Sequence, residues 1–253
     1  MKELLNYRYL LFNLVYKEVK LKYRGSLLGF LWSLLNPLSM IIVYTVAFKY
    51  IIRIKMENYA IFLLAGVLPW SFVVNSLNMA TSCIIDNGNL IKKVFFPREI
   101  IPISTVAFNL VQLILAYIVF LPILAYWKGL NLSLAFLPVL LFLHFLFALG
   151  LSLLLSAVTV YFRDIKHLVE VLLMLAFWVT PIIYPLSMVP ERFHIFMWLN
   201  PMTVFALAYQ KLIYSGQLPG LPSLIIMLSW VIGAYAIGSK TFAWCKPKFA
   251  EEV

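Results

Sequence analysis

Charged side chains are scarce in this sequence. Only 12% of its 253 residues are Asp, Glu, Lys or Arg, whereas 64% are hydrophobic and the mean hydropathy is +0.96. Soluble proteins carry about 25% charged and about 45–50% apolar residues. The shortage of charge excludes a soluble enzyme, a nucleic-acid-binding module and a disordered chain, and it predicts an integral membrane protein.

Cysteine and acidic residues are also few. The two cysteines, Cys83 and Cys245, have no spacing typical of a disulfide framework or a metal site. Twenty Lys and Arg oppose ten Asp and Glu, which gives a net charge of +10. In a membrane protein such an excess is typical of basic loops on one side, so we expect no nucleic-acid partner.

Motifs for catalysis or nucleotide binding are incomplete. Residues 233–241 read GAYAIGSKT, which approaches a phosphate-binding loop, but an extra serine displaces the lysine and the segment ends an apolar stretch. His144 lies within another apolar stretch, where it is either functional or a neutral imidazole bonded between helices. We therefore expect no catalytic residue, no metal site and no cofactor, with any ATP and Mg bound by a separate chain.

Long uncharged stretches divide the chain, and about 20 apolar residues cross a bilayer. Six stretches are candidate spans: 25–48, 58–85, 100–127, 129–162, 171–190 and 212–239. The stretch 193–210 differs, because Asn200-Pro201 interrupts it and proline removes a backbone donor. We predict an all-α integral membrane protein with six transmembrane helices and a re-entrant external helix pair over 191–211. A proline-kinked seventh helix is the alternative.

The distribution of basic residues predicts the orientation. With six spans and both termini in the cytoplasm, fourteen Lys and Arg lie inside and six outside, as the positive-inside rule favours. Seven spans would place Lys240, Lys246 and Lys248 outside. The basic residues of the 49–55 loop are an exception to the rule in either arrangement.

Residues 1–26 have the pattern of an amphipathic helix lying in the cytoplasmic membrane interface. Apolar residues recur at helical spacing at Leu4, Tyr7, Leu11, Leu14 and Val15, opposite a polar stripe of Asn13, Lys17, Lys20 and Arg24. A transmembrane domain over 27–240 and a cytoplasmic tail over 241–253 complete the predicted organisation.

Residues 86–99 read DNGNLIKKVFFPRE and predict a short helix between the second and third spans. Asn87-Gly88 favours a turn, Asn89 is the expected N-cap, and Pro97 ends the helix. Leu90 and Val94 share one face of it. A short apolar helix outside the membrane must cover that face, so it either dips into the interface or inserts into a soluble partner.

Residues 16–37, YKEVKLKYRGSLLGFLWSLLNP, resemble the start of the first span in permeases of polysaccharide-exporting ABC transporters, which carry O-antigen, teichoic acid or capsular polysaccharide. Residues 161–165 (YFRDI), 180–185 (TPIIYP) and 200–203 (NPMT) resemble the regions of their fifth span and of the external turn before the sixth. A threonine at position 180, where serine is frequent, and the basic 49–55 loop depart from the pattern.

The resemblance implies a homodimer with two copies of a separate ATPase docked beneath it. It makes 87–97 the coupling helix, with Asn87, Asn89, Leu90, Ile91, Lys92, Lys93, Val94, Phe95 and Phe96 as its contact residues. It makes 191–211 the external gate helices, with Asn200 and Pro201 at their break. We assign a cytoplasmic entrance to Lys17, Lys20, Tyr23, Arg24, Arg163 and Asp164.

Aromatic residues make up 16% of the chain. Aromatic rings offer weak, repeated contacts to the apolar faces of sugars, and Tyr and Trp add a polar tip. Channel candidates are therefore Trp32, Tyr44, Phe48, Phe177, Trp178 and Tyr184. The alternative is that these side chains face lipid headgroups as interfacial belts.

Together these patterns predict the channel half of an ATP-driven exporter that moves a lipid-linked polysaccharide, O-antigen foremost, across the bacterial inner membrane. Two alternatives remain open at this stage. One is a permease of the same architecture for small molecules or lipids. The other is a membrane-embedded enzyme acting on lipid-linked sugars, which would require facing carboxylates or a histidine cluster.

Overall fold

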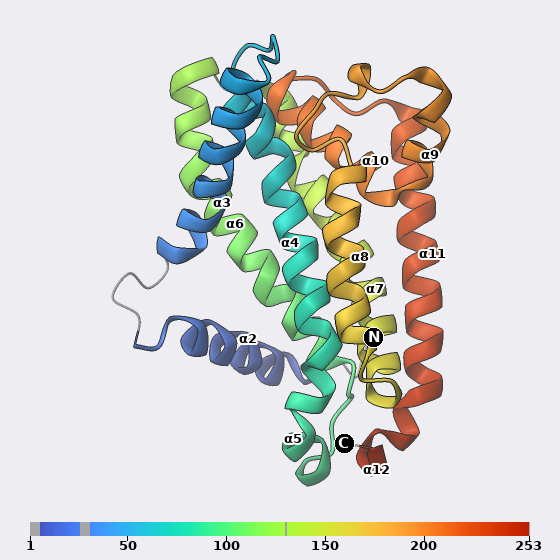
Figure 1. Cartoon of the computed structure of the whole chain (residues 1–253). Helices are drawn as coiled ribbons and strands as arrows, with labels where there is room; N and C mark the ends of the chain where they lie inside the picture. Colours follow the sequence, from blue (N-terminus) through green and yellow to red (C-terminus); the bar gives the residue numbers. More distant parts are fainter. Residues whose placement is uncertain (1–5, 26–30, 130, 253) are drawn as a thin grey trace.

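The computed structural model describes residues 6–25, 31–129 and 131–252, and within these ranges it contains helices and no strand (Figure 1). The α-helices are α2 (Arg8–Tyr23), α3 (Leu31–Tyr44), α4 (Tyr59–Asp86), α5 (Gly88–Lys93), α6 (Ile100–Lys128), α7 (Leu137–Tyr161), α8 (Ile165–Val179), α9 (His194–Leu199), α10 (Pro201–Tyr209), α11 (Leu221–Cys245) and α12 (Phe249–Glu252). Two π-helical segments, η1 (Thr45–Ile51) and η5 (Gln210–Tyr214), continue α3 and α10. Short 3₁₀ turns are η2 (Leu132–Phe136), η3 (Leu186–Met188), η4 (Glu191–Phe193) and η6 (Lys246–Lys248).

Four helical segments of the described chain are long and apolar enough to cross a membrane: Tyr59–Asp86, Ile100–Tyr126, Leu132–Tyr161 and Leu221–Lys248. They correspond to the second, third, fourth and sixth predicted spans. α4 packs against both α6 and α7, and α7 packs against α11, so the four form one bundle (Figure 1). The protein is thus an all-helical, multi-pass membrane protein.

The first and fifth predicted spans are shorter helices. α3 and η1 together run from Leu31 to Ile51 and pass Lys49, where we expected the span to end. α8 begins at Ile165, inside the predicted loop, and ends at Val179, because Thr180 is extended and precedes a proline. The stretch 171–190 is therefore helical only in its first half, and the count of six spans stays a prediction.

The chain between 191 and 211 is broken where the proline predicts it. α9 ends at Leu199, Asn200 is extended, and Pro201 begins α10. The Asn200 side-chain oxygen accepts a hydrogen bond from the Met202 amide at 3.0 Å and so caps α10. The described structure has two helices here in place of one kinked helix; that they are re-entrant stays a prediction.

α2 crosses the end of the bundle where α5 and α12 also lie, which we call the α5 end (Figure 1). It packs against α6, with Leu14 buried and Tyr7, Leu10 and Leu11 partly buried. This confirms a helix with the predicted inward stripe, except for Leu4, which lies outside the described residues. Its exposed face carries the aromatic side chains of Tyr9, Phe12 and Tyr16.

α7 and α11 approach each other closely at two glycines. A methyl group added to Gly238 would lie 1.9 Å from the Gly150 carbonyl oxygen, and one added to Gly150 would lie 2.5 Å from the α11 backbone. Glycine-mediated approach of this kind is a common way to pack helices in membranes. The GAYAIGSKT sequence is therefore part of a continuous packed helix, where its backbone amides are bonded along α11.

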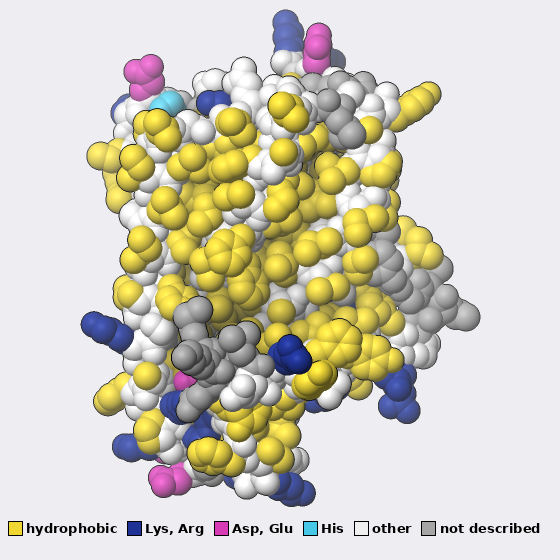
Figure 2. Space-filling view, turned by 180° about the vertical axis from the view of Figure 1, so that it is seen from behind, with side chains coloured by type: hydrophobic (Ala, Val, Ile, Leu, Met, Phe, Trp, Pro, Cys, Tyr) yellow, Lys and Arg dark blue, Asp and Glu magenta, His cyan; other side chains and the backbone are white. Residues whose placement is uncertain are grey.

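A broad hydrophobic surface covers the side of the bundle, and Lys and Arg gather mainly toward the α5 end (Figure 2). Exposed apolar side chains include a stripe along α8 formed by Leu168, Val171, Leu172, Leu175 and Trp178. A surface this apolar requires lipid or another protein to cover it.

Candidate functional site

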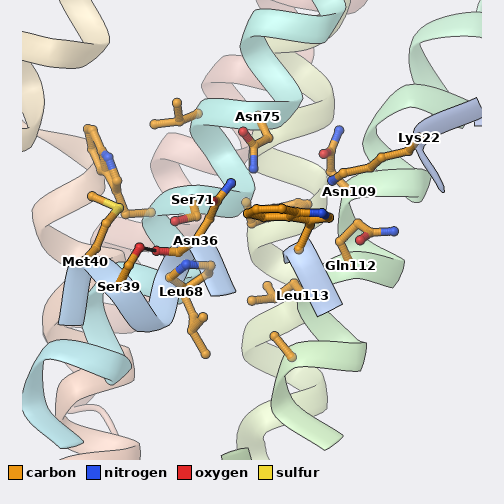
Figure 3. Close-up of a pocket in the computed structure, with 16 residues that line it drawn as sticks. Lys22, Asn36, Ser39, Met40, Leu68, Ser71, Asn75, Asn109, Gln112 and Leu113 are labelled. Atoms are coloured by element: carbon orange, nitrogen blue, oxygen red, sulfur yellow. Dashed lines mark hydrogen bonds between the residues drawn. The ribbon is translucent and has the colours of Figure 1, made fainter. Parts of the chain in front are cut away.

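A cavity of about 490 Å³ lies between α3, α4 and α6, with Lys22 of α2 at its edge. Its lining is unusually polar for the interior of an apolar bundle. The polar side chains are Asn36, Ser39, Ser71, Asn75, Asn109 and Gln112. Figure 3 shows them in two groups, with Asn109, Gln112 and Lys22 on one side and Asn36, Ser39 and Ser71 on the other.

Two tryptophans, Trp32 and Trp70, also line this cavity. Trp32 is 51% exposed, whereas Trp70 is 5% exposed. An indole presents a flat apolar face and one N–H donor. Neutral amides and hydroxyls that alternate with indole faces form a surface suited to a polyhydroxylated ligand. Among the described lining residues, Lys22 carries the one formal charge.

Local backbone features explain why these side chains are presented to the cavity. Pro37 lies inside α3 and interrupts its hydrogen-bond ladder, and the Ser39 hydroxyl donates to the Asn36 carbonyl at 2.8 Å. On α6, the Asn109 amide donates to the Thr105 carbonyl at 2.9 Å. Such bonds from the side chain to its own helix fix the orientation of an amide that would otherwise rotate.

α2 closes the cavity toward the α5 end. The Tyr23 hydroxyl donates to the Gln112 side-chain oxygen and so ties α2 to α6. The Lys22 ammonium lies 5.4 Å from the centre of the Phe108 ring, within the range of a cation–π interaction. Partial burial lowers the pKa of Lys22 below its usual value. Of the predicted entrance residues, Tyr23 therefore contacts the cavity lining directly.

The other predicted entrance residues are exposed and do not line the cavity. Lys20 and Arg24 lie on the exposed face of α2, and Arg163 and Asp164 lie in the turn before α8. Lys17 donates to the Asn87 side-chain oxygen at 3.3 Å, so it connects α2 to the segment between α4 and α6.

The predicted coupling helix is shorter than expected. α5 begins at Gly88 and ends at Lys93, and Val94 is extended. Asn89 is not its N-cap: Asn87 occupies that position, and its amide donates to the Cys83 carbonyl at 2.9 Å. The turn therefore falls at Asn87-Gly88 as predicted, and the N-cap lies two residues before the predicted Asn89.

The apolar residues of this segment divide between the bundle and the outside. Ile91 and Phe96 are buried, and Leu90 packs partly against the core. Phe95 is 97% exposed and Val94 is 50% exposed, beside the exposed Lys92 and Lys93. The predicted Leu90–Val94 face is therefore not the protruding surface. A cavity of about 560 Å³, lined in part by Val94, Phe95, Arg98 and Lys246, adjoins the tip.

The remaining predicted channel aromatics form a cluster away from the cavity lining. Tyr44 stacks on Phe177 with ring centres 5.7 Å apart, Phe48 meets Tyr44 edge-on, and Trp178 meets Phe177 edge-on. Trp70 joins the cluster to the cavity, because its ring lies 5.7 Å from Phe177. The Tyr184 hydroxyl instead donates to the Trp178 and Val179 carbonyls and so caps α8.

Side chains from other helices donate hydrogen bonds to the irregular segment after α8. Tyr59 donates to the Ile183 carbonyl, and the Gln210 amide donates to the Pro181 carbonyl at 2.8 Å. Asn200 donates to the Thr180 hydroxyl at 2.9 Å. Irregular backbone at membrane depth needs partners of this kind. Asn200 and Pro201 are therefore held against the end of α8.

His144 is fully buried in the helix bundle. Its ring stacks on Phe205 at 4.3 Å, and Nδ1 lies 3.3 Å from the Tyr209 hydroxyl. Among the described residues, no three His, Cys, Asp or Glu side chains gather as metal ligands would. The imidazole is placed as a packing and hydrogen-bonding group between α7 and α10.

Sequence reasoning missed the amides of the cavity. Asn36 and Asn75 lie far in the chain from Asn109 and Gln112, which are three residues apart on α6, and the packing of three helices brings the four amides together. The available signal was their presence in otherwise apolar stretches, where an unpaired amide is costly. Of the six predicted channel aromatics, Trp32 is the one that lines this cavity.

A multi-pass helical bundle with a partly exposed polar cavity has the architecture of a membrane transport protein. Residues 9–214 match the family model described as ABC-2 type transporter, and the chain belongs to this family. It is therefore a permease.

Curated relatives match over most of their length. The chain is 34% identical to the O-antigen export system permease protein RfbA of Myxococcus xanthus, over 100% of this chain and 98% of that protein. It is 32% identical to the protein of the same name from Klebsiella pneumoniae, over 93% of this chain and 91% of that protein. It is 24% identical to the polysialic acid transport protein KpsM of Escherichia coli, over 74% of each.

Proposed function

We propose that this permease is the channel half of an ATP-driven exporter that moves a lipid-linked polysaccharide, O-antigen, across the bacterial inner membrane. The names of its relatives support the class of substrate. The observation that carries the proposal is the cavity between α3, α4 and α6, with its neutral amides, hydroxyls and indoles.

The physical requirement is passage of a hydrated chain through a hydrocarbon layer about 30 Å thick. Amide and hydroxyl side chains exchange hydrogen bonds with sugar hydroxyls at small net free energy, and indole faces cover the apolar faces of the rings. Such contacts are individually weak, so a polymer slides past them. A lining rich in fixed charge would bind water or ions more tightly and hold the chain.

The proposed channel requires two copies of the chain. Trp32 and Asn36 line the cavity and are exposed, so a second copy facing them would enclose the pathway. The exposed apolar stripe of α8 is a further surface that a second copy or lipid covers. We therefore propose a homodimer with the pathway between its subunits.

The energy is proposed to come from two copies of a separate ATPase, which bind ATP and Mg. Residues 87–97 form the docking element, and Phe95 with Val94 is the tip that enters the ATPase. The exposure of this tip supports the proposal, because the adjacent exposed apolar side chains of Val94 and Phe95 form a patch of the kind that marks an interaction site. Lys92 and Lys93 beside it favour an acidic rim on the partner.

The basic α5 end is proposed to face the cytoplasm, with both termini there. Residues 1–26 would lie in the membrane interface, 27–240 would form the transmembrane domain, and 241–253 the cytoplasmic tail. Lys17, Lys20, Tyr23, Arg24, Arg163 and Asp164 would surround the entrance. Residues 191–211 would form the external gate.

Export of O-antigen tests the proposal directly. The chain and its ATPase are expressed in bacteria that make lipid-linked O-antigen but lack the native exporter, and surface polysaccharide is measured with an antibody on intact cells. We expect surface polysaccharide only when both proteins are present. Retention of the polysaccharide inside cells, with export of small molecules or lipids instead, would contradict the assignment of substrate.

A further inference from the structure

The C-terminal residues fold back onto the coupling segment. α11 continues to Cys245, beyond the position where the tail was predicted to begin, and η6 (Lys246–Lys248) and α12 (Phe249–Glu252) follow it. α12 contacts α5, so both lie at the same end of the bundle (Figure 1). The two elements are about 150 residues apart in sequence.

Polar contacts join this turn to the chain just after the coupling tip. The Lys246 ammonium lies 2.8 Å from Glu99 Oε1, and the Arg98 guanidinium donates to the Lys246 carbonyl oxygen. Lys246, which follows α11, is thus bound through both its side chain and its backbone to Arg98 and Glu99, the two residues that precede α6.

Apolar packing fixes the same turn to the bundle. Phe249 is fully buried, and its ring meets Phe242 of α11 edge-on at 5.2 Å. The Tyr161 hydroxyl at the end of α7 donates to the Cys245 carbonyl at 3.2 Å. The C-terminal residues are therefore anchored to α11 and α7 on one side and to the coupling segment on the other.

We propose that residues 246–252 act as a clamp that transmits displacement of the coupling segment to α11 and α7. This inference rests on the proposed function. Covalently, residues 87–97 are joined only to α4 and α6, which line the cavity. The clamp adds a second connection, and the glycine-mediated contact of α7 with α11 makes that pair move as one body. ATP-driven motion then reaches both halves of the bundle.

The Lys246–Glu99 ion pair is suited to positioning the coupling segment rather than to stabilising the fold. Its side chains are 38% and 29% exposed, and pairs this exposed to water contribute little to stability. Breaking it should therefore change how the coupling segment is held while leaving the bundle folded. Lys246 and Glu99 are positioning residues in this sense.

The test uses the permease–ATPase complex reconstituted in lipid vesicles with lipid-linked polysaccharide, and measures polysaccharide moved per ATP hydrolysed. For Lys246→Glu we expect this ratio to fall at least fivefold, which corresponds to a coupling free energy on the order of 1 kcal/mol. The rate of ATP hydrolysis should stay within about twofold of the wild-type rate. The double variant Glu99→Lys, Lys246→Glu restores at least half of the ratio, because the pair re-forms with reversed charges. Lys248→Glu, the same charge change at an exposed position of the same turn, leaves the ratio unchanged.

Glu99→Gln removes the ion pair without reversing a charge. It provides a second test of the clamp if the Lys246→Glu variant fails to fold. We expect it to lower the ratio at least twofold without changing the thermal midpoint of the complex. A wild-type ratio in both single variants, or no rescue in the double variant, overturns the clamp. Absence of polysaccharide movement by the wild-type complex would refute the proposed function, and the clamp with it.

Discussion

At the scale of single residues, the amides of the cavity are the most informative feature. Asn36, Asn75, Asn109 and Gln112 line one space between three apolar helices. Amides are costly in hydrocarbon, because each must find partners that lipid does not offer. A cavity that holds water and a hydroxyl-rich substrate would supply these partners, which explains why the amides converge on it.

Trp32 allows a test of substrate contact at this scale. We expect Trp32→Ala to lower polysaccharide export about tenfold, because the ring lines the cavity and its loss removes an indole face from the pathway. Surface polysaccharide on intact cells is the measurement, normalised to the amount of permease in the membrane. Trp244→Ala is the control, because Trp244 is 83% exposed and does not line the cavity. Equal export by both variants would contradict a role for Trp32 in the pathway.

Phe95 is the residue on which partner docking depends. We expect Phe95→Asp to abolish co-purification of the ATPase, because a charged tip cannot enter an apolar cleft without a desolvation cost of several kcal/mol. Phe95→Leu keeps an apolar tip and should retain the partner. Ile91→Asp, at a buried position, should instead destabilise the permease itself. Full recovery of the ATPase with Phe95→Asp would place the docking surface elsewhere.

At the scale of helices, the contact of α7 with α11 depends on two glycines. Gly238→Ala places a methyl group 1.9 Å from a backbone oxygen, so one helix must shift. We expect a loss of about 2 kcal/mol, and a thermal midpoint lower by roughly 4–8 °C in detergent. Gly233→Ala on the same helix meets nothing within 4 Å and should not lower the midpoint, because alanine favours a helix more than glycine does. Identical midpoints for the two variants would show that the helices are not packed as described.

The break between α9 and α10 depends on Asn200. Its side chain caps α10 and also donates to Thr180. We expect Asn200→Ala to cost about 1–2 kcal/mol, which lowers the thermal midpoint by roughly 2–8 °C. Asn200→Asp keeps the capping oxygen but cannot donate to Thr180, so its midpoint should be intermediate. A midpoint for Asn200→Ala equal to that of the unmodified protein would mean that the cap does not stabilise this segment.

Much of the helical architecture was predictable, because the length of an uncharged stretch and the position of a proline determine helices locally. The four long spans and the break at Asn200-Pro201 follow from these features. α8 ends before Pro181, which is a local effect, whereas the path of the chain beyond it and the short α5 were not predictable, because both depend on contacts between distant residues. Tyr59 and Gln210 stabilise the irregular chain after α8, and burial of Ile91 and Phe96 fixes the shape of the coupling segment.

The candidate site was predictable only in part. Short local patterns indicated a helix within 87–97 and polar residues on α2, but the exposed tip at Val94 and Phe95 differs from the predicted Leu90–Val94 face, and the entrance role of Tyr23 stays a prediction. The cavity depends on the packing of α3, α4 and α6, which a single sequence does not specify. The aromatic residues show the same limit: Tyr44, Phe48, Phe177 and Trp178 contact one another, and of the six predicted channel aromatics Trp32 alone lines the cavity.

At the scale of the whole molecule, we propose that the permease has no nucleotide site of its own and depends on a separate ATPase. The sequence GAYAIGSKT lies in the middle of α11 and packs against α7, so its backbone amides cannot surround a phosphate. The basic α5 end carries the exposed tip, the clamp and the amphipathic helix together (Figure 1). We therefore propose that the ATPase displaces the α5 end of the protein, and that this displacement changes the cavity in the bundle.

The most direct test of this central claim is ATP hydrolysis and polysaccharide movement by purified permease in lipid vesicles, measured with and without the ATPase. We predict no ATP hydrolysis and no movement by the permease alone, and ATP-dependent movement when the ATPase is added. Sustained ATP hydrolysis by the permease alone, or polysaccharide movement without the ATPase, would contradict the account.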